Sequence, residues 1–261
     1  MHKKNIIDDA FLFVRSLGME ARKIIKEKVT QDFFYELKQD GTFVTDIDFA
    51  VEDHLRGLIK KRFPDHDIVG EEFPSTLTGS PMRWIIDPID GTHSFRHKVP
   101  LFGTIITLLN ENEPVAGLID LPMLDRCYYG AKDHGAFMNG LPVVIKDLSI
   151  TDRLDLEIIA TGDILQFENV NMQKYFDIIY KNHKRVRTYT DCFGHAMVIE
   201  GSVGAMIDVD LKLWDVAATL LLVKEAGGII LDIPSCGTNG QYNIIFGKPR
   251  LVKWVAAVLG I

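Results

Sequence analysis

The sequence is poor in cysteine, because its 261 residues include only Cys127, Cys192 and Cys236. So few cysteines cannot build a disulfide framework, and their spacing does not match that of a zinc site. Apolar runs stay well short of the roughly 20 residues that a membrane-spanning helix requires. The first residues lead into an amphipathic pattern instead of the apolar core of a signal peptide. We therefore expect a cytoplasmic protein with no membrane partner.

An excess of basic charge is also missing. Lysine and arginine number 29 against 36 aspartates and glutamates, which gives a formal net charge of −7. The basic residues are dispersed, so the chain lacks the basic stripe that binds a nucleic-acid backbone. We expect no nucleic-acid partner. If the protein binds a phosphate group, a metal cation has to bridge the two.

The first half of the chain predicts two helices followed by a sheet. Residues 5–28 carry apolar side chains at helical spacing, and a second helical pattern begins after Thr45, a residue type that caps helices. Between residues 67 and 129 the chain changes to short apolar runs separated by Gly, Pro and Asn, which is typical of strands. Residues 112–114, Asn-Glu-Pro, are expected to form a hairpin turn, so at least part of this sheet is antiparallel.

The second half alternates strand-like and helical segments. The expected strands are 156–160, 205–209, 228–231 and 243–246, and the expected helices are 169–182, 191–201, 214–226 and 248–259. This alternation predicts a layered α/β half, residues 151–261, packed against an α+β half, residues 1–150. Because no flexible linker separates the halves, we expect one compact globule.

The segment W-I-I-D-P-I-D-G-T, residues 84–92, contains the most informative motif. An apolar strand ends there in two aspartates three residues apart. Pro88 restricts the backbone, so that Asp87 and Asp90 can converge across a tight turn. The Ile89 carbonyl would point to the same place. Three oxygens then share one point, and oxygen is the ligand that Mg²⁺ prefers.

Other residues extend this potential site. Gly91 and Thr92 offer backbone N–H groups and a hydroxyl suited to a phosphate oxygen. Glu71 and Glu72 follow another strand, and Asp215 lies in the first turn of an apolar helix. Each feature alone has an ordinary explanation, since Asp-Gly forms turns and an acid near a helix start is favoured by the helix dipole. Their combination favours a site for two metal ions with a bridging carboxylate.

Three markers resemble the inositol monophosphatase family. They are G-E-E at 70–72, W-I-I-D-P-I-D-G-T at 84–92, and W-D-V-A-A with E-A-G-G at 214–218 and 225–228. The resemblance covers most of the chain. It implies a layered αβαβα sandwich, like that of inositol monophosphatases and fructose bisphosphatases, and a Mg²⁺-dependent phosphatase acting on a small phosphate monoester. It also implies sensitivity to Li⁺ and a homodimer.

The same resemblance implies two to three Mg²⁺ ions. Glu71, Asp87 and the Ile89 carbonyl would hold the first. Asp87, Asp90 and Asp215 would hold the second, and Glu71 would help to place a weaker third. Most of these ligands belong to the α+β half, whereas the α/β half supplies Asp215 and the substrate contacts.

The resemblance also assigns the catalytic groups. Gly91 and Thr92 would seat the phosphate. The segment V-T-D-I-D-F-A-V-E matches the family pattern with Asp48 as the acid that pairs with the Thr92 hydroxyl, and Asp46 is the competing choice. This pair and Glu71 would activate a water for in-line attack on phosphorus, without a phosphoenzyme.

The substrate is indicated by two departures from the inositol phosphatases. His93 stands where the family usually has a threonine, and D-C-F-G at 191–194 resembles the D-C-Y-G run of histidinol-phosphatases. In that subgroup acidic residues face a positively charged alcohol, so Asp191 and Asp208 are candidate anchors. The ordinary explanations are a helix N-cap for Asp191 and a strand-end charge for Asp208. We expect histidinol phosphate, with inositol 1-phosphate as the alternative.

Other functions fit less well. A nucleotidase needs an insertion that binds a base, and a sugar bisphosphatase needs a second, basic phosphate pocket, for which Arg185 and Arg187 are the clustered cations nearby. A non-catalytic metal-binding scaffold is the alternative from another class. It would bind Mg²⁺ but release no phosphate from p-nitrophenyl phosphate. The sequence retains every carboxylate that the family resemblance leads us to expect, which favours a phosphatase over a non-catalytic scaffold.

Overall fold

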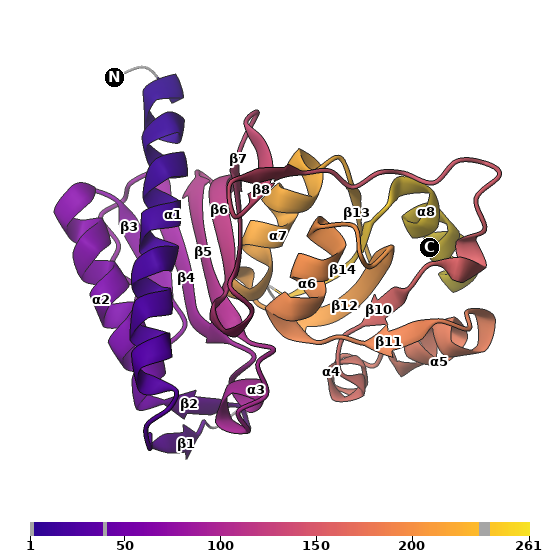
Figure 1. The fold of residues 1–261 in the computed structure, drawn as a ribbon, viewed down its shortest axis with the longest axis horizontal. Helices are drawn as coiled ribbons and strands as arrows, with labels where there is room; N and C mark the ends of the chain where they lie inside the picture. The colour runs from indigo at the N-terminus through magenta and orange to yellow at the C-terminus, as the bar shows by residue number, and fades with distance from the viewer. Residues whose placement is uncertain (1–2, 39–40, 235–240) are drawn as a thin grey trace.

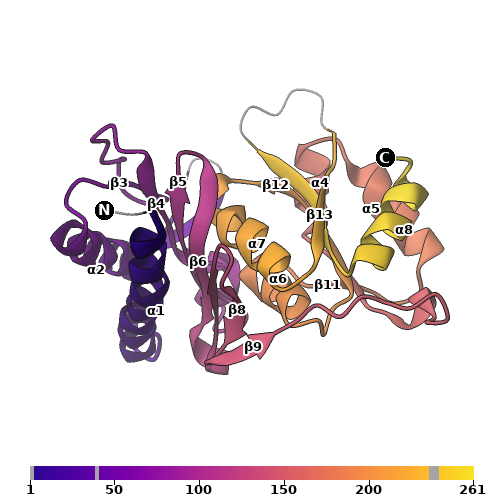
Figure 2. The same cartoon turned by 90° about the horizontal axis from the view of Figure 1, so that it is seen from above.

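The computed structural model describes residues 3–38, 41–234 and 241–261, so Cys236 lies outside the described residues. Its helices and strands stack in five layers, in the order helix, sheet, helix, sheet, helix (Figure 1, Figure 2). This order confirms the predicted αβαβα sandwich. The inner layers bury apolar side chains on both faces, which gives a chain of this length a large core.

Two helices form the first outer layer, α1 (Lys3–Lys28) and α2 (Asp46–Arg62). α1 packs on the neighbouring sheet through completely buried side chains spaced three or four residues apart, namely Ala10, Val14, Leu17, Ala21 and Ile25. A hairpin of β1 (Tyr35–Leu37) and β2 (Phe43–Thr45) joins the two helices. The Thr45 hydroxyl then caps α2, as predicted.

The first sheet has seven strands in sequential order. They are β3 (Asp67–Gly70), β4 (Met82–Asp90), β5 (Gly103–Asn110), β6 (Glu113–Leu121), β7 (Arg126–Ala131), β8 (Gly135–Met138) and β9 (Leu141–Val143). β3 and β4 are parallel, and each other neighbouring pair is antiparallel. The predicted hairpin and its antiparallel strands are confirmed, but the turn is Glu111–Asn112 instead of 112–114, because Asn110 pairs with Glu113. Glu111, with a φ of 61°, supplies the positive φ of a two-residue hairpin.

The second sheet has five strands in the order β11-β10-β12-β14-β13. They are β10 (Ile159–Thr161), β11 (Val186–Thr188), β12 (Ala205–Leu211), β13 (Ile229–Asp232) and β14 (Tyr242–Gly247). β10 is parallel to β11 and β12, whereas β14 is antiparallel to β12 and β13. The strand predicted at 156–160 begins only at Ile159, because a 3₁₀ turn occupies Leu154–Leu156.

Helices cover both faces of the second sheet. α6 (Asp191–Ile199) and α7 (Leu213–Glu225) lie between the two sheets (Figure 1). The outer helices are α4 (Ile164–Asn169), α5 (Gln173–Asn182) and α8 (Pro249–Leu259). The helix predicted over about 169–182 is confirmed as α5 but begins four residues later, at Gln173. α4 and α5 are separate because Asn171 has a φ of 58°, which is not helical.

The middle layer joins the two halves of the chain. The chain passes from the first sheet to the second between β9 and β10, and α7 contacts strands of both sheets.

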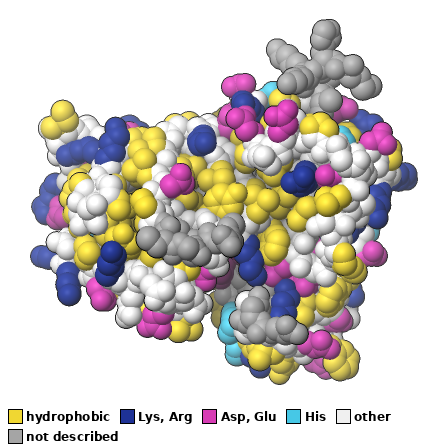
Figure 3. All heavy atoms as spheres, turned by 180° about the vertical axis from the view of Figure 1, so that it is seen from behind, with side chains coloured by type: hydrophobic (Ala, Val, Ile, Leu, Met, Phe, Trp, Pro, Cys, Tyr) yellow, Lys and Arg dark blue, Asp and Glu magenta, His cyan; other side chains and the backbone are white. Residues whose placement is uncertain are grey.

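On the face drawn in Figure 3, Lys and Arg side chains lie scattered among acidic and apolar ones. None of the helices within the described ranges combines the length and apolarity needed to cross a bilayer.

Candidate active site

A bulge at the end of β4 directs Asp87 and Asp90 to the same place. Residues three apart on a regular strand point to opposite faces of the sheet. Here Asp87 pairs with Ile105 and Asp90 with Gly103, so three steps along β4 match two along β5. The extra residue restores a common face for the two aspartates. They converge, as the motif predicts, but within a bulged strand instead of a tight turn.

The backbone after the bulge is fixed at two points. The Thr104 hydroxyl donates a hydrogen bond to the Pro88 carbonyl at 2.8 Å. Gly91 has a φ of 84°, a left-handed conformation that glycine adopts without strain. The short helix α3, Thr92–Arg96, follows directly. Its first two residues line the same cavity as the aspartates, and there the ring of His93 is exposed.

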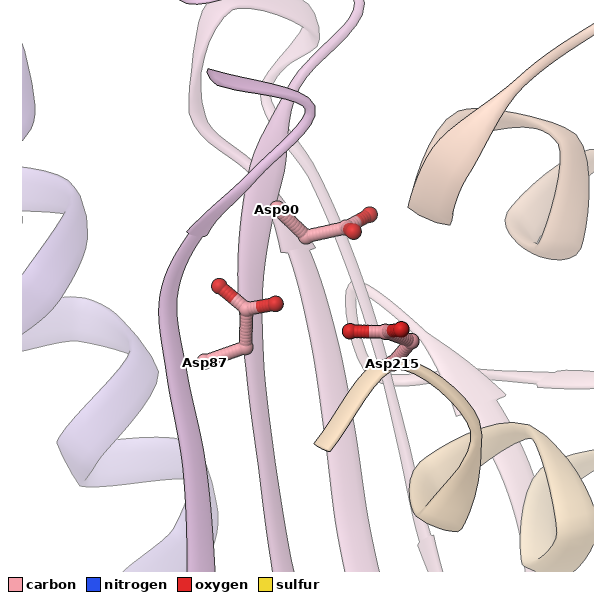
Figure 4. Close-up of side chains that lie close together, drawn as sticks. All are labelled: Asp87, Asp90 and Asp215. Atoms are coloured by element: carbon pink, nitrogen blue, oxygen red, sulfur yellow. The ribbon is translucent and has the colours of Figure 1, made fainter. Parts of the chain in front are cut away.

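Asp215 reaches this point from the second half of the chain (Figure 4). It lies in the first turn of α7, where its Oδ2 accepts the backbone N–H of Lys212 at 2.7 Å. One carboxylate oxygen from each of Asp87, Asp90 and Asp215 lies within 4.8 Å of the others. Three carboxylates this close can bind hard divalent cations.

The cluster is electrostatically unfavourable without a cation. Burial raises the pKa of Asp87 and of Asp90, and neighbouring carboxylates raise both further. Burial also raises the pKa of Asp215 to about 7. The buried Oδ1 of Asp87 has no hydrogen-bond donor among the described residues. A divalent cation would satisfy this oxygen and offset the repulsion, so the donor set fits Mg²⁺.

Glu71 and Glu72 lie at the edge of the cluster and share one ammonium group. Lys38 Nζ donates to Glu71 Oε1 at 2.8 Å and to Glu72 Oε1 at 2.7 Å. Burial opposes the charge of Lys38, but the two carboxylates outweigh burial and raise its pKa. Burial raises the pKa of Asp87 most, and the negative charge of Glu71 is the next largest cause. Lys38 therefore offsets part of the negative charge beside the aspartates.

Asp48 is buried near the cluster, but it does not form the predicted pair with Thr92. Its Oδ2 accepts the backbone N–H of Thr45 at 2.8 Å and also the Thr45 hydroxyl, which completes the capping box of α2. The Thr92 hydroxyl donates instead to the Ile89 carbonyl at 3.0 Å. The nearby cap residue Thr45 thus supplies the hydrogen-bond donors that Asp48 accepts. Asp46, the competing choice, is exposed, and its Oδ1 accepts the backbone N–H of Phe34 at 3.2 Å.

The stability of the metal-free protein is expected to fall as the pH rises. Burial raises the pKa of Asp48 and of Asp215 to about 7, whereas an unfolded aspartate has a pKa of about 3.9. The folded state therefore binds more protons between these values, and stability present below about pH 4 is lost as the pH rises through about 7.

Mg²⁺ should reverse this loss, because it binds the ionised carboxylates. We expect Mg²⁺ to raise the Tm more at pH 8 than at pH 5. Thermal unfolding followed by circular dichroism, in EDTA and in Mg²⁺, measures both effects. An equal shift at the two pH values would contradict a carboxylate metal site.

The cluster opens into a strongly acidic cavity of about 370 Å³. Seven carboxylate residues line it: Glu71, Asp87, Asp90, Asp191, Asp208, Asp210 and Asp215. Among the described lining residues, Lys212 is the one lysine or arginine. Such a wall attracts cations, and it repels a phosphate unless metal ions neutralise it. The volume suits a small molecule.

Asp191 and Asp208 form a second acidic group in this wall. Asp191 begins α6, and Asp208 lies on β12. Burial raises the pKa of Asp191 to about 6, the Thr190 hydroxyl bound to it opposes that rise, and Asp208 adds to it. The N-cap of α6 is Thr190. The ordinary explanation of Asp191 as the helix cap is therefore wrong.

His195 joins Asp208 in a buried hydrogen-bonded group. Its Nε2 lies 2.9 Å from Asp208 Oδ2, and its Nδ1 lies 2.7 Å from Thr219 Oγ1. His195 and Asp208 are each 1% exposed, yet both line the cavity. A Thr-His-Asp group can activate a nucleophile. Thr219, however, is completely buried in α7 and is not among the described lining residues, so we assign it no nucleophilic role.

The structure brings nearly all the sequence-predicted site residues to one cavity. Those that line the cavity are Glu71, Asp87, Ile89, Asp90, Gly91, Thr92, His93, Asp191, Asp208 and Asp215. Asp48 lies outside this set. Sequence reasoning missed Lys38 and His195. His195 follows Asp191 by four residues on one helix, a spacing that places both on one face and could have revealed it. Lys38 gives no local signal, because its partners are 33 and 34 residues away.

Known proteins provide an independent comparison. The inositol monophosphatase family model matches residues 9–259. The chain is 35% identical over 227 residues to a histidinol-phosphatase of Chlorobaculum parvum, covering 85% of each. It is 31% identical over 248 residues to an inositol monophosphatase of Dictyostelium discoideum, covering 90% of this chain and 89% of that one. A solved structure of a Thermotoga maritima IMPase gives a TM-score of 0.81 at 28% identity, covering 97% of this chain and 98% of that chain.

Proposed function

The chain belongs to the inositol monophosphatase family, and from this premise we propose that it is a Mg²⁺-dependent phosphatase that hydrolyses histidinol phosphate. Family membership supports a phosphoric monoester hydrolase acting on a small phosphate ester. The identity of the metal, the identity of the ester and the roles of single residues are the proposal.

The acidity of the cavity wall carries the choice of ester. Asp87, Asp90 and Asp215 already form a set that can bind metal, and Asp191 and Asp208 add two further carboxylates to the same cavity. Histidinol offers an ammonium and an imidazole, which such carboxylates attract. Inositol offers neutral hydroxyl groups, for which neutral partners suffice. We propose that Asp191 and Asp208 contact the cationic alcohol.

The family resemblance suggests the metal ligands, and the convergence of Asp87, Asp90 and Asp215 supports one of the sites. We propose that Glu71, Asp87 and the Ile89 carbonyl hold one Mg²⁺, that Asp87, Asp90 and Asp215 hold a second, and that Glu71 helps to place a third. The Ile89 carbonyl accepts the Thr92 hydroxyl with one lone pair and keeps another for a cation. When bound, Mg²⁺ would supply activation of water and stabilisation of the leaving oxygen.

The protein's own groups would orient the ester and accept a proton. The backbone of Gly91 and Thr92 can donate to a phosphate oxygen, because this turn precedes α3. Glu71, which lines the cavity, is the proposed first acceptor for the proton of the attacking water. The Thr92 hydroxyl could pass a proton to Asp48 only if it turned from the Ile89 carbonyl, its present acceptor, and if Asp48 released the Thr45 hydroxyl. Asp48 has a pKa of about 7, raised by burial, so it can exchange a proton near neutral pH. The water would attack in line with the leaving alcohol, without a phosphoenzyme.

Inositol 1-phosphate is the second candidate substrate, because some curated relatives are named inositol monophosphatases. A sugar bisphosphatase is less well supported. Arg185 and Arg187 donate to backbone carbonyls and are not among the described lining residues, so a second phosphate would meet acidic groups. A nucleotidase would likewise need room for a base. Family membership disfavours a non-catalytic scaffold.

The ester is tested by comparing two substrates in Mg²⁺. L-Histidinol phosphate and inositol 1-phosphate are offered separately, and phosphate release gives kcat/KM for each. We expect histidinol phosphate to be preferred by a large factor. A preference for inositol 1-phosphate would refute the proposed role of Asp191 and Asp208 while leaving the metal site intact.

Li⁺ is expected to inhibit the enzyme, because a monovalent ion that occupies one Mg²⁺ position cannot supply the same charge. Initial rates at fixed Mg²⁺ and increasing LiCl measure the effect, with NaCl at equal ionic strength as the control. Full activity in high Li⁺ would count against the proposed arrangement of metal sites.

Two further properties belong to the proposal. We propose that the protein works in the cytoplasm, a reducing compartment that suits the free thiols of Cys127 and Cys192. We also propose a homodimer, as the family resemblance implies. Size-exclusion chromatography with light scattering measures the assembly directly, and a monomeric mass would contradict it.

A further inference from the structure

We infer that His195 is a positioning residue that fixes the Asp208 carboxylate for binding the alcohol part of the ester. The inference deepens the proposed function and rests on it, since it assumes that Asp208 contacts the substrate. His195 comes from α6 and Asp208 from β12, so the pair links the middle helical layer to the second sheet. Phosphate chemistry at the aspartate cluster does not use this pair.

Both oxygens of Asp208 are held. Oδ2 lies 2.9 Å from His195 Nε2, and Oδ1 accepts the backbone N–H of Val209 at 3.0 Å. An ionised carboxylate can only accept hydrogen bonds, so the proton of the neutral imidazole lies on Nε2. Nδ1 then accepts the Thr219 hydroxyl, 2.7 Å away. Asp208 thus selects the tautomer, and the Thr219 hydroxyl supplies the donor that this tautomer needs at Nδ1.

The backbone leaves room for this orientation. A Cβ at Gly162 would lie 2.2 Å from Asp208 Oδ1, so only a residue without a side chain permits the observed position. The ring of His195 is itself fixed, because it packs edge-on against Phe246 with 5.0 Å between centroids. Asp208 is therefore held by a donor on each oxygen and by packing around both groups.

Such a carboxylate is a pre-organised partner for a cation. Each oxygen keeps a lone pair beyond the hydrogen bond that it accepts, and Asp208 lines the cavity. Because the side chain is already fixed, little conformational freedom is lost when a ligand binds. Without His195, Asp208 would lose its Oδ2 donor in a buried site and could rotate away from the cavity. Binding of the alcohol should suffer, and the hydrolysis of an ester without that alcohol should suffer much less.

The test is a substrate ratio measured in His195→Phe and His195→Gln. Phe keeps the ring but removes both hydrogen bonds, whereas the Gln amide nitrogen can take the place of Nε2. kcat/KM is measured for the natural ester that the wild type prefers and for p-nitrophenyl phosphate, which lacks the natural alcohol. We expect His195→Phe to lower the ratio of the two values by about tenfold to a hundredfold, mainly through KM. His195→Gln should restore most of it.

Two more variants keep the inference testable if His195→Phe fails to fold. Thr219→Val removes the hydroxyl that bonds to Nδ1 with little change in shape, and it should lower the same ratio by a smaller factor. His183→Phe is the matched control, because His183 is also buried but bonds to the Leu154 carbonyl outside the cavity. It should leave the ratio unchanged.

The outcomes separate this inference from the proposed function. If His195→Phe lowers kcat/KM for both esters equally, or if His195→Gln rescues nothing, His195 is only structural and the inference is overturned. If the wild type prefers inositol 1-phosphate, the proposed substrate is wrong. The ratio for that ester then still decides whether His195 positions Asp208.

Discussion

Asp90→Asn is expected to lower kcat by about a thousandfold or more, because it removes a negative ligand from the proposed metal site. The fold should survive. The Asn carbonyl can still accept the backbone N–H of Cys192, which now donates to Asp90, and its amide can donate to a neighbouring carboxylate. Because burial and the charges of Asp191 and Asp215 raise the pKa of Asp90, the neutral side chain should also stabilise the metal-free protein above pH 7.

Asp120→Asn is the matched control, since it changes a buried carboxylate of the same sheet outside the cavity. Asp120 is 1% exposed and pairs with Arg22 at 2.6 Å. Loss of that pair should lower the Tm by about 5 °C or more, with little change in kcat. Turnover in Mg²⁺ and thermal unfolding in EDTA are measured for both variants. Near-normal turnover by folded Asp90→Asn would refute the metal assignment.

Asp208→Asn is expected to lower kcat/KM for histidinol phosphate by about thirtyfold to a thousandfold, because the charge that attracts the cationic alcohol is lost. The Asn carbonyl can still accept from His195, but the backbone N–H of Val209 then loses its acceptor. That structural part of the loss should appear equally with both esters. The loss for p-nitrophenyl phosphate should be much smaller. Steady-state kinetics on the two esters measure the difference.

Asp163→Asn is a suitable control for this change. Asp163 caps α4 near Asp191, and asparagine is an equally good N-cap residue. A neutral substitution there should leave the discrimination between esters unchanged. Equal losses on both esters in Asp208→Asn would show that Asp208 supports the fold instead of binding the alcohol.

The sequence predicts the Asp87–Asp90 part of the proposed metal site because its signals are local. Asp87 and Asp90 share one motif, and the apolar run before them shows the strand end. The bulge that brings them to one face could not be predicted, because it depends on the register of β4 against β5, which only the paired strands define. The layered α/β second half could be predicted for the same reason, since alternating segments are visible along the chain, whereas the full αβαβα order follows from the family resemblance.

Contacts between distant residues could not be predicted from one sequence. Lys38 meets Glu71 and Glu72 through a hairpin whose position no local pattern fixes. The family resemblance predicts that Asp48 pairs with Thr92, but the adjacent cap residue Thr45 binds Asp48 in this structure. Likewise, the hydrogen bond between His195 and Asp208 could not be predicted, because it forms only when β12 lies beside α6.

One measurement tests the central claim most directly, namely phosphate release from L-histidinol phosphate by the purified protein in Mg²⁺, then in EDTA, then after Mg²⁺ is restored. The proposed carboxylate site predicts turnover in Mg²⁺, complete loss in EDTA and recovery on re-addition. Phosphate release that persists in EDTA, or none under any of the three conditions, would contradict a Mg²⁺-dependent histidinol phosphatase.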